Sequence, residues 1–175
     1  MRRVIENSMD IICLNGEFFP LEEARLVATD AGLLYGQGVF TTARVERSQI
    51  LHGDFHFKRL AEGARIFQIP FRLNEEEFLS LCEQVIDANQ LSTARLRATL
   101  TRGPVRGHPI QASEDEESLI ITAVSWKDPE VWDEGIRVVW APFPKNHLSP
   151  LSRVKNCNYT EFILARNFAK SKDAD

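Results

Sequence analysis

Two neighbouring segments with apolar residues at helical spacing limit most strongly what this chain can fold into. In residues 54–70, apolar side chains recur at intervals of three and four, at Phe57, Leu60, Ala64 and Phe67. Asp54 is suited to cap the start of a helix, and Pro70 stops the run. The segment therefore predicts an amphipathic helix.

The second segment, residues 74–91, repeats this pattern. Asn74 is a favourable cap, and the three glutamates that follow it suit the positive end of a helix dipole. The apolar stripe consists of Phe78, Leu81, Cys82 and Val85. A second helix is predicted here.

Strand patterns surround the two helices. Asn15-Gly16 lies between apolar arms, and because both residues accept positive φ angles, the pair predicts a β-hairpin. A glycine-punctuated segment is expected to form a tight loop before a strand around residues 39–43. Three further alternating or apolar runs, at 94–101, 118–126 and 136–143, are predicted as strands. The mixture predicts an α+β fold.

The charged segment 127–135 carries Pro129 and Gly135, which is typical of a linker or an exposed turn. We therefore expect a small N-terminal α+β domain at 1–126, a linker at 127–135 and a second domain that begins at 136. A length of 175 residues suits one domain or two small ones.

Composition argues against several classes of partner. The chain has 21 Lys and Arg residues against 25 Asp and Glu, and no basic block long enough to neutralise a run of phosphates, so we expect no nucleic acid partner. No apolar stretch approaches the roughly 18 residues of a membrane span, which predicts no membrane association and a cytoplasmic protein. Cys13, Cys82 and Cys157 form no CxxC pair and are expected to be buried thiols.

Four places in the sequence carry polar residues that are candidates for a site. His52, Asp54 and His56 would align as metal ligands on a strand, but their segment enters a helix, so no metal is expected. Arg59 has Gly63 one helical turn later, which suits either a solvated side chain or a phosphate-binding helix face.

The glycine-rich turn at 101–110 follows a strand and carries Arg102, Arg106 and His108. It is either a surface turn or a trap for a carboxylate, which arginine binds through two hydrogen bonds. Lys155 stands between a Pro/Ser-rich entry and a predicted helix at 158–170, and its residue type alone favours solvation.

Four segments occur in an order that resembles a known family: "DAGLLYGQGVFTTARV", "HFKRLAEGARIF", "TRGPVRGH" and "SPLSRVKNCNYTEFILA". They resemble the successive signatures of class IV aminotransferases, the fold-type IV pyridoxal-phosphate enzymes. That group includes branched-chain and D-amino-acid aminotransferases and aminodeoxychorismate lyases. The resemblance spans about residues 10 to 170 and implies a two-domain fold and pyridoxal 5'-phosphate as cofactor.

The resemblance assigns roles to residues. Lys155 matches the lysine that forms a Schiff base with the cofactor, and Arg59 matches the arginine that binds its phosphate. Tyr159 resembles a tyrosine near the phenolic oxygen of the cofactor, although it also suits the first apolar residue of a helix. Phe40 matches a position that lines the substrate pocket and is a tyrosine in D-amino-acid aminotransferases. This difference weakens the assignment of the chain to the D-amino-acid enzymes.

The substrate loop leaves the reaction open. Arg106 and His108 match a pair that receives the substrate carboxylate in the D-amino-acid enzymes, yet RGPVRG also resembles a turn of aminodeoxychorismate lyases. We expect amino-group transfer from a small amino acid to a 2-oxo acid. The alternative is a lyase that releases pyruvate from an amino-chorismate and gives 4-aminobenzoate. Family members are usually dimers with sites near the interface, so a homodimer is expected.

One departure from the family concerns length. In the family the chain continues past the lysine helix and supplies a carboxylate for the pyridine nitrogen, whereas this sequence ends at Asp175. We therefore expect the second domain, 136–175, to be incomplete and the sequence to be a fragment. A truncated protein without catalysis of its own is the remaining alternative.

Overall fold

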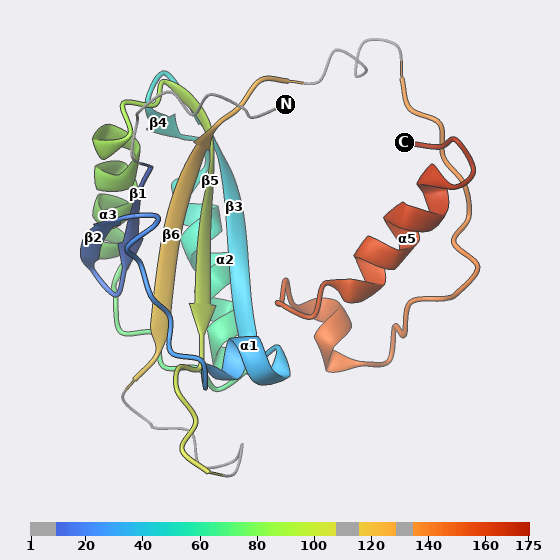
Figure 1. The fold of residues 1–175 in the computed structure, drawn as a ribbon, viewed down its shortest axis with the longest axis horizontal. Coiled ribbons are helices and arrows are strands. Elements are labelled where there is room, and N and C mark those ends of the chain that lie inside the picture. Colours follow the sequence, from blue (N-terminus) through green and yellow to red (C-terminus); the bar gives the residue numbers. More distant parts are fainter. Residues whose placement is uncertain (1–9, 108–115, 129–134) are drawn as a thin grey trace.

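The computed structural model describes residues 10–107, 116–128 and 135–175. Within them, six strands form one antiparallel sheet in the order β2-β1-β6-β5-β3-β4 (Figure 1). The strands are β1 Ile11–Leu14, β2 Glu17–Pro20, β3 Gly38–Glu46, β4 Gln49–Ile50, β5 Thr93–Thr101 and β6 Ser118–Ser125. Helices and an antiparallel sheet in one body confirm the predicted α+β class.

The predicted hairpin is the β1–β2 pair. Asn15 and Gly16 adopt φ angles of 55° and 86°, and Leu14 pairs with Glu17 across the turn. Both positive φ angles suit the type I′ turn that the Asn-Gly pair indicates.

The two predicted helices are α2 Gly53–Ile66 and α3 Glu75–Ala88, and both cover the same face of the sheet (Figure 1). Their apolar stripes enter the core, where Leu60 and Ala64 of α2 and Phe78, Cys82 and Val85 of α3 are buried. Asn74 caps α3 as predicted. Its side chain accepts a hydrogen bond from the backbone N of Glu77 at 2.9 Å, and the Glu77 carboxylate accepts one from the backbone N of Asn74 at 2.9 Å.

The predicted cap of α2 was wrong. His52, with φ at 55°, precedes the helix without a side-chain capping bond, and Asp54 lies inside the first turn. Asp54 instead pairs with Lys58 one turn later, at 3.0 Å. The helix begins earlier than expected because the tight turn after β4 ends at the left-handed His52.

The predicted strands at 39–43, 94–101 and 118–126 correspond to β3, β5 and β6. Alternate residues of β5, namely Leu96, Ala98 and Leu100, are buried on the helix side. β3 pairs with β5 over its whole length, from Gly38 opposite Thr101 to Glu46 opposite Thr93. The loop expected before β3 contains a short helix, α1 Ala31–Tyr35.

The predicted strand at 136–143 was wrong. This segment has no strand structure, and Val138 and Trp140 are exposed, Trp140 by 95%. A strand needs a neighbour for its backbone hydrogen bonds, and no strand of the described residues lies beside it. The segment leads to a 3₁₀ turn, Pro150–Arg153, and to α5 Thr160–Lys170, which confirms the last predicted helix.

The division into two domains stays a prediction, since residues 129–134 of the proposed linker lie outside the described ranges. Among the residues that the structure describes, no helix is long and apolar enough to cross a membrane.

Candidate functional site

Lys155 lies in a segment that extends the sheet beside the start of β3. The backbone N of Phe40 donates to the carbonyl O of Lys155 at 3.0 Å, and the backbone N of Cys157 donates to the O of Gly38 at 2.8 Å. Val39 and Asn156 form the antiparallel bridge between these two bonds. The backbone of the lysine is therefore held by β3 of the N-terminal sheet.

Two asparagines shape the backbone around the lysine. The side-chain amide of buried Asn156 donates to the carbonyl oxygens of Leu151 and Val154 at 2.8 and 3.0 Å, and its oxygen accepts from the backbone N of Asn158. The Asn158 amide then donates to the O of Gly36 at 3.0 Å. Gly36 is left-handed, and a Cβ there would clash with the Asn158 side chain.

The Lys155 ammonium faces aromatic rings and two positive charges. Its Nζ lies 4.5 Å from the centroid of the Phe40 ring and 5.7 Å from that of Tyr159. Burial, and then repulsion from Arg59 and Arg97, lower the pKa of Lys155 below its ordinary value. The free amine, which is the nucleophilic form, is thereby favoured.

Arg59 lies on α2 at its contact with β3. Its Nη2 donates to the Thr41 hydroxyl at 2.7 Å and lies 3.2 Å from Nδ1 of His56. Among the described residues no carboxylate pairs with Arg59. Gly63 permits α2 to pack closely on β3 and on the lysine segment, since a Cβ there would lie 3.1 Å from Cγ1 of Val39 and 3.2 Å from Cγ1 of Val154.

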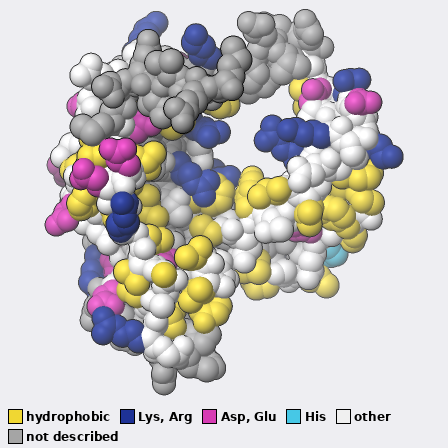
Figure 2. All heavy atoms as spheres, in the orientation of Figure 1, with side chains coloured by type: hydrophobic (Ala, Val, Ile, Leu, Met, Phe, Trp, Pro, Cys, Tyr) yellow, Lys and Arg dark blue, Asp and Glu magenta, His cyan; other side chains and the backbone are white. Residues whose placement is uncertain are grey.

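Arg59, Lys155 and Tyr159 line one hollow of about 830 Å³, which we call the Lys155 hollow. Other lining residues come from the segment before the lysine and from α5, among them Lys145, Asn146, Ser149 and Phe162. Figure 2 shows basic side chains in the opening between the sheet and the α5 segment. The structure thus brings together the three residues expected to contact the cofactor.

The remaining aromatic residues form one stack. Phe40 is only 4% exposed, and the guanidinium of Arg97 lies 3.7 Å from its ring centroid. The Tyr159 ring meets Phe40 edge-on at 5.5 Å and stacks on Phe162 at 4.7 Å. Phe40 therefore contacts the lysine amine, although it is not a wall residue of the Lys155 hollow.

Sequence reasoning missed Arg97. Its guanidinium is half-buried beside Phe40, its Nε donates to the Thr99 hydroxyl at 3.0 Å, and burial lowers its pKa. The available signal was its alternation with Leu96 and Ala98, which places Arg97 on the sheet face opposite the helices. Pattern alone does not show that this face is next to Lys155.

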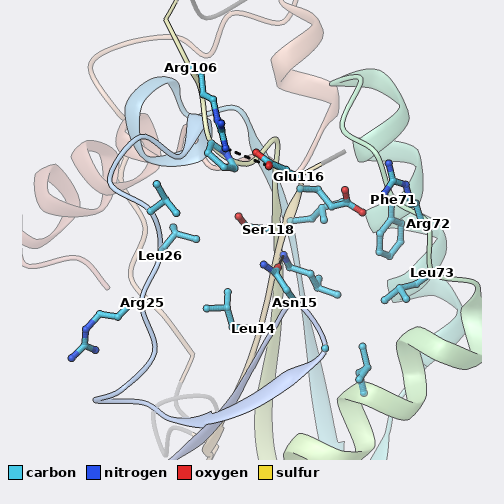
Figure 3. A pocket seen from close by; sticks show the side chains of 17 residues that line it. Leu14, Asn15, Arg25, Leu26, Phe71, Arg72, Leu73, Arg106, Glu116 and Ser118 are labelled. Carbon is cyan, nitrogen blue, oxygen red and sulfur yellow. Dashed lines mark hydrogen bonds and ion pairs between the residues drawn. The ribbon is translucent and has the colours of Figure 1, made fainter. Parts of the chain in front are cut away.

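Arg106 lies elsewhere. It lines a second hollow, of about 590 Å³, together with Leu14, Arg25 and Phe71 (Figure 3), which we call the Arg106 hollow. Its side chain is 81% exposed and lies 3.6 Å from the Glu116 carboxylate. Neither hollow is lined by both Arg106 and Lys155. His108, its predicted partner, lies outside the described residues.

The three residues weighed as metal ligands separate in the structure. Asp54 pairs with Lys58, whereas Nδ1 of His56 lies 2.8 Å from the Thr41 hydroxyl. Burial, with repulsion from Arg59 and His52, lowers the pKa of His56. In the described ranges, no cluster of three or more His, Cys, Asp or Glu side chains is placed to hold a metal ion.

The sequence pattern of the family described as "Amino-transferase class IV" matches residues 38–175, which include Arg59 and Lys155. This chain belongs to the class IV aminotransferase family. The family assignment and the predicted fold type IV are thereby confirmed, and members of this family are enzymes.

Similar proteins include both aminotransferases and a lyase. A D-alanine aminotransferase of Staphylococcus aureus (strain N315) is 28% identical over 69% of this chain and 43% of its own length. The T.th. branched-chain amino acid aminotransferase complexed with N-(5'-phosphopyridoxyl)-L-glutamate has a TM-score of 0.81 and 25% identity, over 97% of this chain and 58% of that one. A putative 4-amino-4-deoxychorismate lyase from Legionella pneumophila has a TM-score of 0.81 and 25% identity, over 87% of this chain and 55% of that one.

This chain spans about half the length of the relatives it matches. The phosphopyridoxyl ligand in a solved relative supports pyridoxal phosphate as the cofactor of the family, as the sequence motifs imply.

Proposed function

We propose that the protein carrying this chain transfers an amino group from a small amino acid to a 2-oxo acid, through a Schiff base between pyridoxal phosphate and Lys155. One observation carries the proposal. A lysine whose pKa is lowered shares a hollow with an arginine that has no carboxylate partner in the described ranges. An amine nucleophile and an anion-binding guanidinium are the two groups that an aldehyde phosphate requires.

The residues fit the cofactor at each of its ends. The free guanidinium edge of Arg59 is suited to the phosphate, the Lys155 amine to the aldehyde and the Tyr159 hydroxyl to the phenolic oxygen. When bound, the cofactor supplies an aldehyde and an electron-accepting ring. Lys155 binds it covalently and, once released by an incoming amine, holds or transfers the proton at its Nζ.

A lyase is the second candidate. Its support is the structural similarity to the putative 4-amino-4-deoxychorismate lyase, together with the RGPVRG turn. Both reactions start from the same bond between amino substrate and cofactor, so the lysine and Arg59 keep the same tasks in either reaction.

We also propose that the protein acts as a homodimer, because Arg106 does not line the Lys155 hollow of its own chain. If Arg106 receives a substrate carboxylate, as predicted, it does so in the Lys155 hollow of a second copy.

Borohydride trapping tests the cofactor site directly. The chain is incubated with pyridoxal phosphate, reduced with borohydride and mapped by peptide mass spectrometry. We expect the label on Lys155 and its loss in Lys155→Ala. Lys145 is the matched control, since its side chain lines the same hollow but donates to the O of Ser152 at 3.3 Å. Labelling of Lys145, Lys127 or Lys170 in place of Lys155 would reject the assignment.

A substrate panel then separates the two reactions. The protein is assayed with L- and D-amino acids plus a 2-oxo acid, and separately with 4-amino-4-deoxychorismate. Formation of a new amino acid supports transfer, whereas pyruvate and 4-aminobenzoate support the lyase. A labelled Lys155 without turnover in either assay supports a protein without catalysis of its own.

A further inference from the structure

Three side chains form a closed triangle where α2 crosses β3. The Thr41 hydroxyl lies 2.7 Å from Nη2 of Arg59 and 2.8 Å from Nδ1 of His56, and the third side, Nη2 to Nδ1, is 3.2 Å. The triangle follows from the helix register. Gly63 packs on Val39. Arg59, one turn earlier on α2, and His56, two turns earlier, both reach Thr41, the next inward residue of β3.

The chemistry of the three groups fixes the direction of each bond. Arginine only donates, so Thr41 Oγ1 accepts from Arg59, and the hydroxyl proton is free to point at His56. Nδ1 of His56 then faces two donors and must be an acceptor, which places the imidazole proton on Nε2. The guanidinium is thus oriented by two neutral acceptors.

Neutral acceptors differ in one respect from the usual partner of an arginine. A carboxylate would orient the guanidinium but would also cancel its charge, whereas a hydroxyl and a neutral imidazole leave the charge uncompensated. Arg44, Arg65 and Arg106 show the contrast, since each pairs with an acidic side chain. Within the described residues Arg59 has no such partner.

We propose that Thr41 and His56 are positioning residues that orient Arg59 through neutral acceptors and so reserve its charge for the dianionic phosphate of the cofactor. The inference rests on the proposed function for the identity of the anion. It goes beyond that function by assigning phosphate recognition to two residues outside the Lys155 hollow. Thr41 is 2% exposed, and neither its hydroxyl nor Nδ1 of His56 is available to bind the ligand itself.

The test separates phosphate recognition from all other contributions to cofactor binding. Dissociation constants are measured for pyridoxal phosphate and for pyridoxal, from the absorbance of the C=N bond that forms with loss of water. The ratio of the two constants is the phosphate preference. A fixed, mildly alkaline pH keeps the phosphate ester dianionic.

We expect Thr41→Val, which removes one hydroxyl with little change of shape, to lower the phosphate preference about tenfold, because a hydrogen bond to a charged group is lost. Affinity for pyridoxal should stay as in the wild type, and Thr41→Ser should restore the preference. Thr42→Val is the matched control, since the adjacent side chain lies on the opposite face of β3. His56→Phe provides a second variant and should also lower the preference.

A purely structural role would weaken pyridoxal and pyridoxal phosphate equally, and that result would overturn the inference. So would an unchanged preference in both Thr41→Val and His56→Phe.

Sulfate titration, followed by NMR of the His56 ring, makes the test independent of Lys155 chemistry. Sulfate is a dianion without an aldehyde, and we expect Thr41→Val to weaken its binding about tenfold. Unlabelled Lys155 with sulfate binding that depends on Thr41 would reject the proposed function and keep the inference. A wild-type chain that does not bind sulfate, or binds it as tightly as Thr41→Val does, would overturn the inference.

Discussion

Protonation of Lys155 is opposed by burial and by positive charges on two other elements. Burial is the largest cause, and repulsion from Arg59 on α2 and Arg97 on β5 adds to it, so the pKa of the ammonium is lowered. A lysine with a lowered pKa has more free amine at any pH near its midpoint, and its reaction with an aldehyde begins at a lower pH than that of an ordinary lysine.

We predict that Arg97→Gln raises the pKa of Lys155, because one of the two repelling charges is removed. The pH midpoint of the reaction of Lys155 with pyridoxal should therefore move upward. Pyridoxal is used because it lacks the phosphate that Arg59 would bind. The midpoint is read from borohydride-trapped label on Lys155 as pH is varied.

Arg95→Gln is the control for this prediction. Arg95 is exposed two residues earlier on β5, and its guanidinium lies 5.2 Å from the Trp126 ring centroid. It does not contribute to the pKa shift of Lys155. An equal upward shift in both variants would assign the effect to net charge rather than to the position of Arg97.

At the scale of elements, the start of α1 is fixed by one buried carboxylate. Asp30 is fully buried and accepts hydrogen bonds from the backbone N of Gly32 at 2.7 Å and from the hydroxyls of Thr101 and Ser118 at 2.7 and 3.1 Å. It thereby joins α1 to β5 and β6. Because Gly36 and Gly38 follow this helix and bond to the lysine segment, the carboxylate also supports the site.

Asp30→Ala should lower the free energy of unfolding by about 3 to 5 kcal/mol, the sum of a lost helix cap and two buried hydroxyls without an acceptor. Urea unfolding, followed by circular dichroism, measures the change. Asp54→Ala is the control, since Asp54 pairs only with exposed Lys58, and a small effect is expected there. Similar losses in the two variants would contradict the structural role of Asp30.

The link between Asn158 and Gly36 allows a second prediction at this scale. Asn158→Ala removes the side-chain bond to the O of Gly36 but keeps the backbone bonds of Lys155 and Cys157 to β3. We expect slower labelling of Lys155 by pyridoxal, because the backbone beside the amine is less well fixed. Asn146→Ala is the control in the same hollow. Equal labelling rates in both variants would show that the β3 bonds alone position the lysine.

Several elements could be predicted from the sequence because their signals are local. Asn15-Gly16 determines a turn through its own φ angles, and Asn74 caps α3 through a bond three residues away. The strand at 136–143 was mispredicted because a strand depends on a neighbour, which its own pattern does not contain. The triangle of Thr41, His56 and Arg59 depends on how α2 lies across β3, so no local pattern indicates it.

The candidate site shows the same limit. Lys155 and Arg59 are almost a hundred positions apart in the sequence, and they were paired only through the family resemblance. Their meeting in one hollow follows from the bridge between Val39 and Asn156, which joins the lysine segment to the strand that α2 covers.

At the scale of the whole molecule, the two faces of the sheet are covered differently by the residues that the structure describes. α2 and α3 pack on one face (Figure 1). On the other face Lys155 and Tyr159 lie against buried Phe40, whereas Ile120 is partly exposed and Val124 is exposed. Exposed apolar residues of α1, Leu33, Leu34 and Tyr35, add to the uncovered surface. Exposed apolar side chains favour association with another protein surface where they form a patch.

The last prediction concerns how two copies share a site. If Arg106 serves the Lys155 hollow of a second copy, Lys155→Ala and Arg106→Leu each impair a different half of a composite site. Homodimers of either variant should then turn over poorly, the second through a raised KM for carboxylate substrates. A heterodimer of the two variants, isolated through a different affinity tag on each chain, combines one intact lysine with one intact arginine. It should recover about half of the wild-type activity, because one of its two sites is complete.

If Arg106 acted within its own chain, the heterodimer would hold no complete site: one would lack Lys155 and the other Arg106. Activity no higher than that of the Arg106→Leu homodimer would therefore reject the shared site and leave Arg106 to its contact with Glu116.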